Sequence, residues 1–183
     1  MVFSRMKKRV AIDMDEVMAD PYEKLIRLYE EEYGIPIDQS KLPGHYLQDI
    51  VHPDHRSSIR RYLFAKDFFE DLVVMPNSQE VMREMHEHYE IFIVTAAMEF
   101  PDSLGPKYRW LERYFPFIHW SHYVFCGDKS IVQADFLVDD HAKNLVNFSG
   151  EPLLFSSPHN AYETRFTRLN NWQEVAQYFL SDV

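Results

Sequence analysis

The sequence has a single cysteine, Cys126, which excludes an intrachain disulfide. One thiol fits a reducing compartment, and we expect a cytoplasmic location. Long apolar runs are lacking as well. The apolar stretch after the basic N-terminal residues, Val10 to Ile12, is too short for a signal peptide, and no later run approaches the ~18 residues of a membrane span. We therefore expect a soluble protein that has no membrane partner.

Positive charge is scarce, since 19 Lys and Arg residues stand against 29 Asp and Glu residues, for a net charge of −10. A protein that binds polymeric nucleic acid needs a surplus of basic residues on one face, so we expect no such partner. The ligand must instead be small, or be held by a local positive site or a metal. The 183 residues, 46% of them hydrophobic, suffice for about one domain with an ordinary core. The oligomeric state stays open, and a homodimer is compatible with the sequence.

Short apolar runs rich in β-branched and aromatic residues alternate with amphipathic stretches, a pattern typical of an α/β fold around a mainly parallel sheet. No internal repeat interrupts it. Ser78 is expected to cap the N-terminus of one helix. The predicted strands are Val10 to Asp13, Ile91 to Thr95, Tyr123 to Phe125, Phe136 to Val138, and Leu153 to Phe155. The predicted helices are Tyr22 to Tyr33, Ser78 to His88, Lys107 to Tyr114, and Trp172 to Leu180.

The stretch between the first predicted strand and Ser78 is of a different kind. It contains turn residues such as Gly34, Pro43 and Pro53, and no run resembling a buried strand, so we interpret it as a helical insertion. The predicted division is an α/β core of residues 1–19 and 76–183 and an inserted helical layer of residues 20–75. The aromatic residues of this layer either pack its interior or line a pocket for a flat ring. They are Tyr22, Tyr29, Tyr33, Tyr46, Tyr62, Phe64, Phe68 and Phe69.

Acidic residues follow two of the predicted strands. Asp13 and Asp15 come at the end of the first strand, where residues i and i+2 of an extended backbone point to the same side. Asp139 and Asp140 follow the strand that begins at Phe136. Each pair alone is also compatible with a solvated turn or a helix cap. Two such pairs at the carboxyl edge of one sheet predict a site for a hard divalent cation such as Mg2+.

Two further polar residues come at the ends of strands in the same predicted sheet. Thr95 and Ala96 follow the run Ile91 to Val94, and backbone N–H groups next to such small residues can approach an anion closely. Lys129 follows the run Tyr123 to Phe125 and places a cation near another strand end. In isolation, Thr95 is typical of a hydrogen-bonded strand terminus and Lys129 of a surface charge.

The order of these residues, DxD, then Thr, then Lys, then DD, resembles the four motifs of the haloacid dehalogenase-like phosphohydrolases. The resemblance to the 5'(3')-deoxyribonucleotidase family is closer and covers about Val10 to Asn144. It implies a doubly wound, Rossmann-like sheet with a small helical cap inserted after the first strand. The segments that carry it are 13–20 (DMDEVMAD), 68–72 (FFEDL) with Pro76 beyond, 107–108 (KY), 110–115 (WLERYF), 128–130 (DKS) and 134–140 (ADFLVDD).

The resemblance implies a Mg2+-dependent phosphomonoesterase that acts on (deoxy)nucleoside monophosphates. Asp13 would be the nucleophile that forms an aspartyl-phosphate, and Asp15 would be the general acid and then the general base. The phosphate oxygens would be bound by Thr95, the backbone N–H of Ala96 and Lys129. The Mg2+ ion would be held by Asp13, the backbone carbonyl of Asp15 and Asp140, with Asp139 in support.

Residues of the insertion would contact the leaving group. His45, Tyr46 and Leu47 fall where the family carries aromatic residues that stack on the base, and Phe69 falls on another base-contacting position. The chain departs from the family there, since His45 replaces an aromatic carbocycle, Pro21 replaces a phenylalanine, and the insertion contains no tryptophan. These departures leave the substrate open between a nucleotide and another small phosphorylated metabolite.

Other interpretations of these residues fit less well. A receiver domain also has an acidic pair, a phosphoryl-accepting Asp, a Thr and a Lys, but its acidic pair follows the first strand and it lacks an insertion. A binding module without catalytic activity would not need all four polar motifs. Lys143 competes with Lys129 for the phosphate, but only Lys129 has flanking residues that match the family. Close histidine pairs such as His119 and His122 lack the further ligands of a zinc pattern, so we expect ordinary surface or packing residues.

Overall fold

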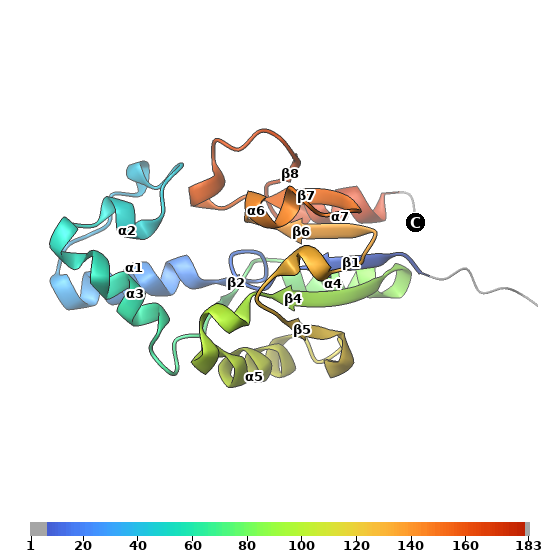
Figure 1. Cartoon of the computed structure of the whole chain (residues 1–183), viewed down its shortest axis with the longest axis horizontal. Helices are drawn as coiled ribbons and strands as arrows, with labels where there is room; N and C mark the ends of the chain where they lie inside the picture. The colour runs from blue at the N-terminus through green and yellow to red at the C-terminus, as the bar shows by residue number, and fades with distance from the viewer. Residues whose placement is uncertain (1–6, 182–183) are drawn as a thin grey trace, which may run out of the picture.

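The computed structural model describes residues 7–181, with a six-stranded sheet at the centre (Figure 1). The strand order is β5, β4, β1, β6, β7, β8, and all neighbouring strands are parallel. Because strands are added on both sides of β1, the predicted doubly wound, Rossmann-like fold is confirmed. The strands are β1 (Arg9–Ile12), β4 (Glu90–Thr95), β5 (Tyr123–Phe125), β6 (Phe136–Asp139), β7 (Glu151–Phe155) and β8 (Thr167–Leu169).

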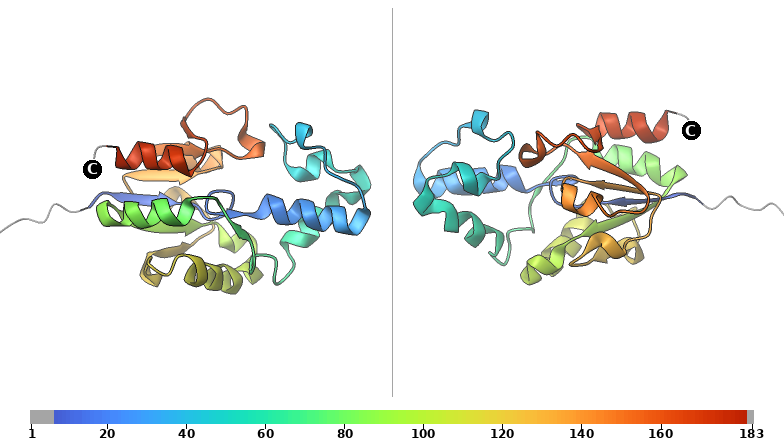
Figure 2. Two further views of the ribbon diagram at one scale, coloured as in Figure 1. Left: turned by 180° about the vertical axis from the view of Figure 1, so that it is seen from behind. Right: turned by 45° about the horizontal axis from the view of Figure 1, so that its top comes forward.

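Helices cover both faces of this sheet. On one face α4 and α7 lie side by side (Figure 2) and bury Val10 and Ile12 of β1 beneath them. On the other face α6 buries Leu145 against Ala11 and Leu137. Covering on both faces explains why the strands are continuous apolar runs. The helices of the core are α4 (Ser78–His88), α5 (Leu104–Tyr114), α6 (Ala142–Leu145) and α7 (Trp172–Leu180). Within residues 7–181 none of the helices has the length and apolar character needed to cross a membrane.

The predicted cap of α4 at Ser78 is wrong. The N-cap residue is Asn77, whose backbone is left-handed with φ of 65°. The Ser78 hydroxyl donates instead to the backbone carbonyl of Met75 at 2.7 Å. The serine therefore stabilises the turn that precedes the helix, and the free N–H groups of the first turn receive no bond from its side chain.

The residues between β2 (Ala19–Asp20) and β3 (Val73–Val74), which we call the helical insertion, form a group of helices at one end of the molecule, on the left in Figure 1. β2 and β3 pair antiparallel, so the chain leaves and re-enters the core through one short ribbon. The Asp20 carboxylate accepts a bond from the Glu23 N–H at 3.0 Å and starts the first helix, which ends at the left-handed Gly34. The helices are α1 (Pro21–Tyr33), α2 (Leu47–Ile50) and α3 (Arg56–Leu63).

Most aromatic side chains of the insertion form its interior. Buried examples include Tyr29 and Tyr62, whereas Phe64 and Tyr46 are more than 40% exposed. Packing therefore accounts for much of the aromatic content of this segment, and only a few rings are left to contact a ligand.

Candidate active site

The polar residues at the strand ends meet at the edge of the sheet that faces the helical insertion (Figure 1). β1, β4 and β6 are adjacent and parallel, and their carboxyl ends carry Asp13, Thr95 and Asp139. Asp13 extends the β1 ladder by one residue, because its N–H donates to the carbonyl of Val138 at 2.9 Å. Parallel strands end at a common edge, which explains why residues so far apart in sequence come together.

A cavity of about 330 Å³ separates this edge from the insertion. Its two sides differ in chemistry, since the sheet side is charged and the insertion side is mainly aromatic and aliphatic. A small ligand with one anionic end and one apolar end fits this lining. The sheet side includes Asp13, Asp15, Ala96, Lys129 and Asp140, and the insertion side includes Pro21, Tyr22, Tyr46, Leu47, Leu63 and Phe69.

Lys129 is buried between two carboxylates. Its Nζ lies 2.8 Å from Oδ1 of Asp13 and 2.6 Å from Oδ2 of Asp139, and its side chain is 1% exposed. Burial alone would lower the pKa of Lys129, but attraction to the two carboxylates outweighs burial and raises the pKa above its ordinary value. Asp139 also accepts bonds from the Asn144 side chain at 3.0 Å, so its position is fixed from two sides. The lysine is a permanent positive charge next to Asp13.

The carboxyl groups of Asp13 and Asp140 lie in surroundings that disfavour their negative charge, and their pKa values are raised. Burial raises the pKa of Asp13 to about 7, even though Lys129 opposes the shift. Burial, Glu16 and the two neighbouring carboxylates raise the pKa of Asp140 well above its ordinary value. Among residues 7–181, neither carboxylate oxygen of Asp140 has a hydrogen-bond partner.

The carboxylates of Asp13, Asp139 and Asp140 form a site that fits a divalent cation. One oxygen each from Asp13, Asp139 and Asp140 lie within 4.8 Å of one another. Carboxylate oxygens are the ligands that hard cations such as Mg2+ prefer. The unpartnered oxygens of Asp140 and the raised pKa of Asp13 are both what an acidic cluster shows before positive charge is added. The side chain of Asp15 lies outside this group, because it bonds elsewhere.

Asp15 is paired with Lys107, a residue whose importance the sequence did not reveal. The Nζ of Lys107 donates to the Asp15 carboxylate and to the Thr95 hydroxyl, the latter at 2.9 Å. Lys107 is fully buried, on the same face of α5 as Trp110 and Leu111. A lysine at i in a helix whose i+3 and i+4 residues form the core is the pattern that could have identified it. Thr95, which accepts from Lys107, keeps its own hydroxyl proton free to donate.

The residues expected to contact the leaving group divide into two sets. Tyr46, Leu47 and Phe69 line the cavity, as does Lys143, the second candidate for a phosphate ligand. His45 does not line it, because its Nδ1 lies 3.1 Å from the carbonyl of Pro43 and its ring is exposed. The structure therefore brings three of the four predicted insertion residues to the cavity.

Sequence reasoning also missed a group of polar residues beside Asp140. His159 lies in the loop after β7, and its ring stacks on Tyr46 with centroids 4.8 Å apart. His141 lies 4.4 Å from His159, centroid to centroid. Burial and the neighbouring His159 lower the pKa of His141 to about 4, so its ring is neutral at pH 7. The position of His159 after another strand end was the available indication.

Comparisons with known proteins point to one enzyme family. The family model described as 5' nucleotidase, deoxy (pyrimidine), cytosolic type C protein matches residues 7–182. A 5'(3')-deoxyribonucleotidase of Bacillus subtilis is 39% identical over 181 residues, which cover 96% of this chain and 100% of that protein. A Staphylococcus epidermidis protein that carries the provisional name 5'(3')-deoxyribonucleotidase is 43% identical over 175 residues, 96% of this chain and 97% of its own.

Solved structures share the fold at low sequence identity. A haloacid dehalogenase-like family hydrolase of Streptococcus pneumoniae superposes with a TM-score of 0.60 at 13% identity, covering 94% of this chain and 98% of that one. A HAD-hydrolase of Bacillus subtilis, solved with bound magnesium, superposes with a TM-score of 0.59 at 13% identity. The match covers 96% of this chain and 99% of that one. The chain shares the fold of haloacid dehalogenase-like hydrolases, and the sequence matches show that it belongs to the 5' nucleotidase, deoxy (pyrimidine), cytosolic type C family.

Proposed function

We propose that the protein removes the phosphate group from deoxyribonucleoside monophosphates in a Mg2+-dependent reaction. The observation that carries the proposal is the two-sided cavity, which has buried charges at the strand ends and aromatic rings on the insertion. The charged side suits a phosphate and the aromatic side suits a base. The relatives named 5'(3')-deoxyribonucleotidase support the same class of substrate.

Asp13 is the nucleophile in this proposal. Its carboxylate attacks phosphorus, the bond from phosphorus to the sugar oxygen breaks, and an aspartyl-phosphate forms. Lys129, 2.8 Å away, favours the ionised form that attack requires. Mg2+ held by Asp13, the backbone carbonyl of Asp15 and Asp140, with Asp139 in support, would supply further positive charge that keeps Asp13 ionised beside a phosphate dianion.

Three groups along the sheet edge bind the phosphate oxygens. Lys129 supplies a buried positive charge, and the Thr95 hydroxyl has a free proton because Lys107 already donates to its oxygen. The N–H of Ala96 belongs to a residue that lines the cavity. Donors held in fixed positions stabilise the charge that spreads over the phosphate oxygens in the transition state.

Asp15 is the general acid and base. It protonates the leaving sugar oxygen as the first bond breaks, and it then takes a proton from the water that hydrolyses the aspartyl-phosphate. Lys107 holds the carboxylate in place, since both are joined by an ion pair and Lys107 is itself fixed within the core.

The helical insertion acts as a cap over the core of residues 1–19 and 76–183. Tyr46 and Phe69 offer rings for stacking on a base, and Leu47 offers an aliphatic contact beside them. His45 lies outside the lining, so the base contacts are assigned to the other three residues. Cavity residues Pro21 and Leu63, where the chain departs from the family, shape the remaining wall.

A phosphate-release assay tests this function. The panel contains thymidine and deoxyuridine monophosphates, purine deoxynucleotides and sugar phosphates, each with Mg2+ and with EDTA. We expect turnover of deoxynucleotides in Mg2+ only, and none by Asp13→Asn. Turnover of sugar phosphates without any nucleotide would reassign the substrate to another small metabolite and keep the chemistry. No turnover of any phosphate ester would refute the proposal.

A further inference from the structure

Three side chains that commonly bind transition metals meet beside the acidic cluster. The Oδ2 atom of Asp140 lies 3.5 Å from Nε2 of His141 and 3.5 Å from Nε2 of His159. One ligand atom from each of the three residues lies within 4.8 Å of the other two. Asp140 comes from the end of β6, whereas His159 comes from the loop between β7 and β8, so sequence spacing could not reveal the group.

The separation of these atoms matches ligands of one metal ion. Two ligands bound to the same ion at about 2.1 Å with tetrahedral angles lie roughly 3.4 Å apart. A direct hydrogen bond between the imidazole and the carboxylate would bring them to about 2.9 Å. The observed 3.5 Å therefore fits a shared ion better than a direct bond.

The atoms that face one another are buried and have no partner. The His159 side chain is 6% exposed and that of Asp140 is 2% exposed. In the part of the chain that the structure describes, neither Nε2 of His159 nor either oxygen of Asp140 makes a hydrogen bond. Unpaired buried polar atoms are costly, and a cation between them removes that cost.

The other ring nitrogen of His159 is held as in metal-binding histidines. The Ser157 hydroxyl donates to the Glu16 carboxylate, so its oxygen is left to accept the proton of His159 Nδ1, 2.8 Å away. Glu16 itself lies 3.3 Å from that nitrogen. A proton on Nδ1 leaves the lone pair of Nε2 directed at Asp140. Metal-ligating histidines generally donate this second ring N–H to a carboxylate, a backbone carbonyl or a water, and Ser157 and Glu16 offer comparable oxygens here.

The rest of the loop fixes His159 relative to Asp140. The side-chain amide of Asn160 donates to the backbone carbonyls of Asp140 and Phe155, each at 2.8 Å. On the insertion side, Tyr46 stacks on the His159 ring at an interplanar angle of 13°. These contacts hold His159 and Asp140 in fixed relative positions.

We propose that Asp140, His141 and His159 form a binding site for a divalent transition-metal ion such as Zn2+, which shares Asp140 with the all-oxygen cluster of Asp13, Asp139 and Asp140. Two imidazoles and one carboxylate are a ligand set that suits Zn2+, whereas carboxylates alone suit Mg2+. Asp140 and His141 line the cavity, so a fourth ligand can come from water or from a bound anion. His141 and His159 are not among the close histidine pairs considered in the sequence, because they come from separate segments of the chain.

Calorimetric titration of Zn2+ into the full chain tests the site, with Mg2+ at saturation and no substrate present. We expect one equivalent to bind, and binding to weaken at least about tenfold in His159→Phe and in His141→Phe. Phenylalanine keeps a ring for stacking and removes the nitrogens. Thermal unfolding checks that each variant is folded. If His159→Phe does not fold, His141→Phe still tests the site, because the His141 side chain is 28% exposed and its replacement disturbs packing less.

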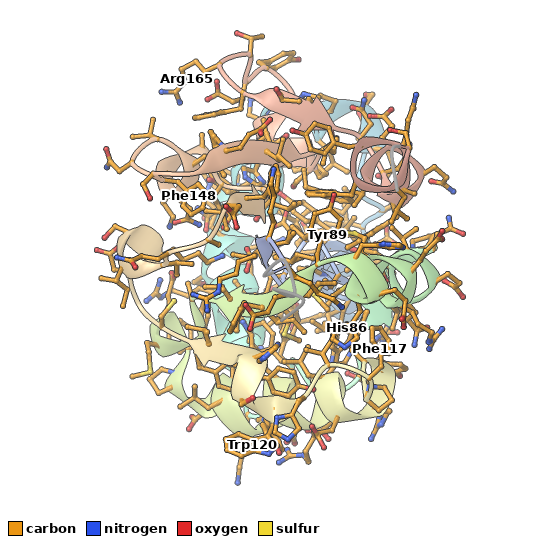
Figure 3. All side chains as sticks on the ribbon, turned by 90° about the vertical axis from the view of Figure 1, so that its right-hand side faces the viewer. His86, Tyr89, Phe117, Trp120, Phe148 and Arg165 are labelled. Atoms are coloured by element: carbon orange, nitrogen blue, oxygen red, sulfur yellow. The ribbon has the colours of Figure 1, made fainter. Side chains whose placement is uncertain are left out.

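His86→Phe is the matched control. His86 also has a buried Nδ1 without a hydrogen-bond partner in residues 7–181, but it belongs to none of the groups of metal-ligating side chains found there. It lies beside Phe117, on the side of the molecule that Figure 3 shows and away from the insertion. Its Zn2+ affinity should equal that of the wild type. Absence of Zn2+ binding by the wild type, or wild-type affinity in both His159→Phe and His141→Phe, would overturn the proposal whether or not the protein hydrolyses nucleotides.

Discussion

Replacing Asp13 with asparagine should stabilise the metal-free protein while it abolishes hydrolysis. Burial of Asp13 outweighs its attraction to Lys129 and raises its pKa from 3.8 to about 7. The folded protein therefore keeps a proton that the unfolded chain has lost at the same pH. Because the unfolded state binds fewer protons between pH 4 and 7, the stability of the wild type falls as the pH rises through that window.

The size of this effect follows from the pKa difference. The difference between 3.8 and about 7 is about 3 pKa units, and at 1.36 kcal/mol per unit it corresponds to about 4 kcal/mol. Asparagine resembles the protonated carboxyl group in shape and charge, so the stability of the variant does not fall as the pH rises. We expect Asp13→Asn to match the wild type at pH 4, and to be more stable by about 2 kcal/mol at pH 5.5 and by about 4 kcal/mol at pH 8.

Urea denaturation in EDTA from pH 4 to 8 measures the difference. Asp102→Asn, at an exposed position, is the control and should follow the wild-type profile. Mg2+ should narrow the gap at pH 8, because a cation beside Asp13 stabilises its ionised form. The reasoning is refuted if Asp13→Asn is less stable than the wild type at pH 8 in EDTA, or if the difference is constant across the pH range.

Three further substitutions probe the site and its support. Lys107→Met should lower kcat about 10²- to 10³-fold and the free energy of unfolding by about 2 kcal/mol, because Asp15 and Thr95 lose their shared donor. Steady-state kinetics and urea denaturation measure both, and unchanged kcat would contradict the role of Lys107. Tyr46→Ala should raise KM for thymidine monophosphate up to about tenfold but not for glycerol phosphate, which has no ring to stack. An equal rise for both would argue against stacking. Trp110→Phe removes the indole bond to the Leu72 carbonyl and should cost about 1 kcal/mol in urea denaturation at unchanged kcat. A fall in kcat would show that this contact also shapes the site.

The central strands could be predicted because their signal is local. β1, β4 and β6 are covered on both faces, so each is a short run of apolar residues that stands out in the sequence. β2 and β3 have two residues each, and β8 carries Arg168 at its centre, so none of them has such a run. Their pairing depends on neighbours supplied by the rest of the fold.

From the strand-end pattern one could predict that Asp13, Thr95 and the pair Asp139 and Asp140 share one site, because the carboxyl ends of adjacent parallel strands meet at the same edge. It did not determine what surrounds them. Lys107 contacts Asp15 across 92 positions of sequence, and His159 reaches Asp140 through a loop. These contacts follow from the tertiary structure, since a lysine or a histidine acquires its role by being buried beside a carboxylate, and burial is a property of the whole fold.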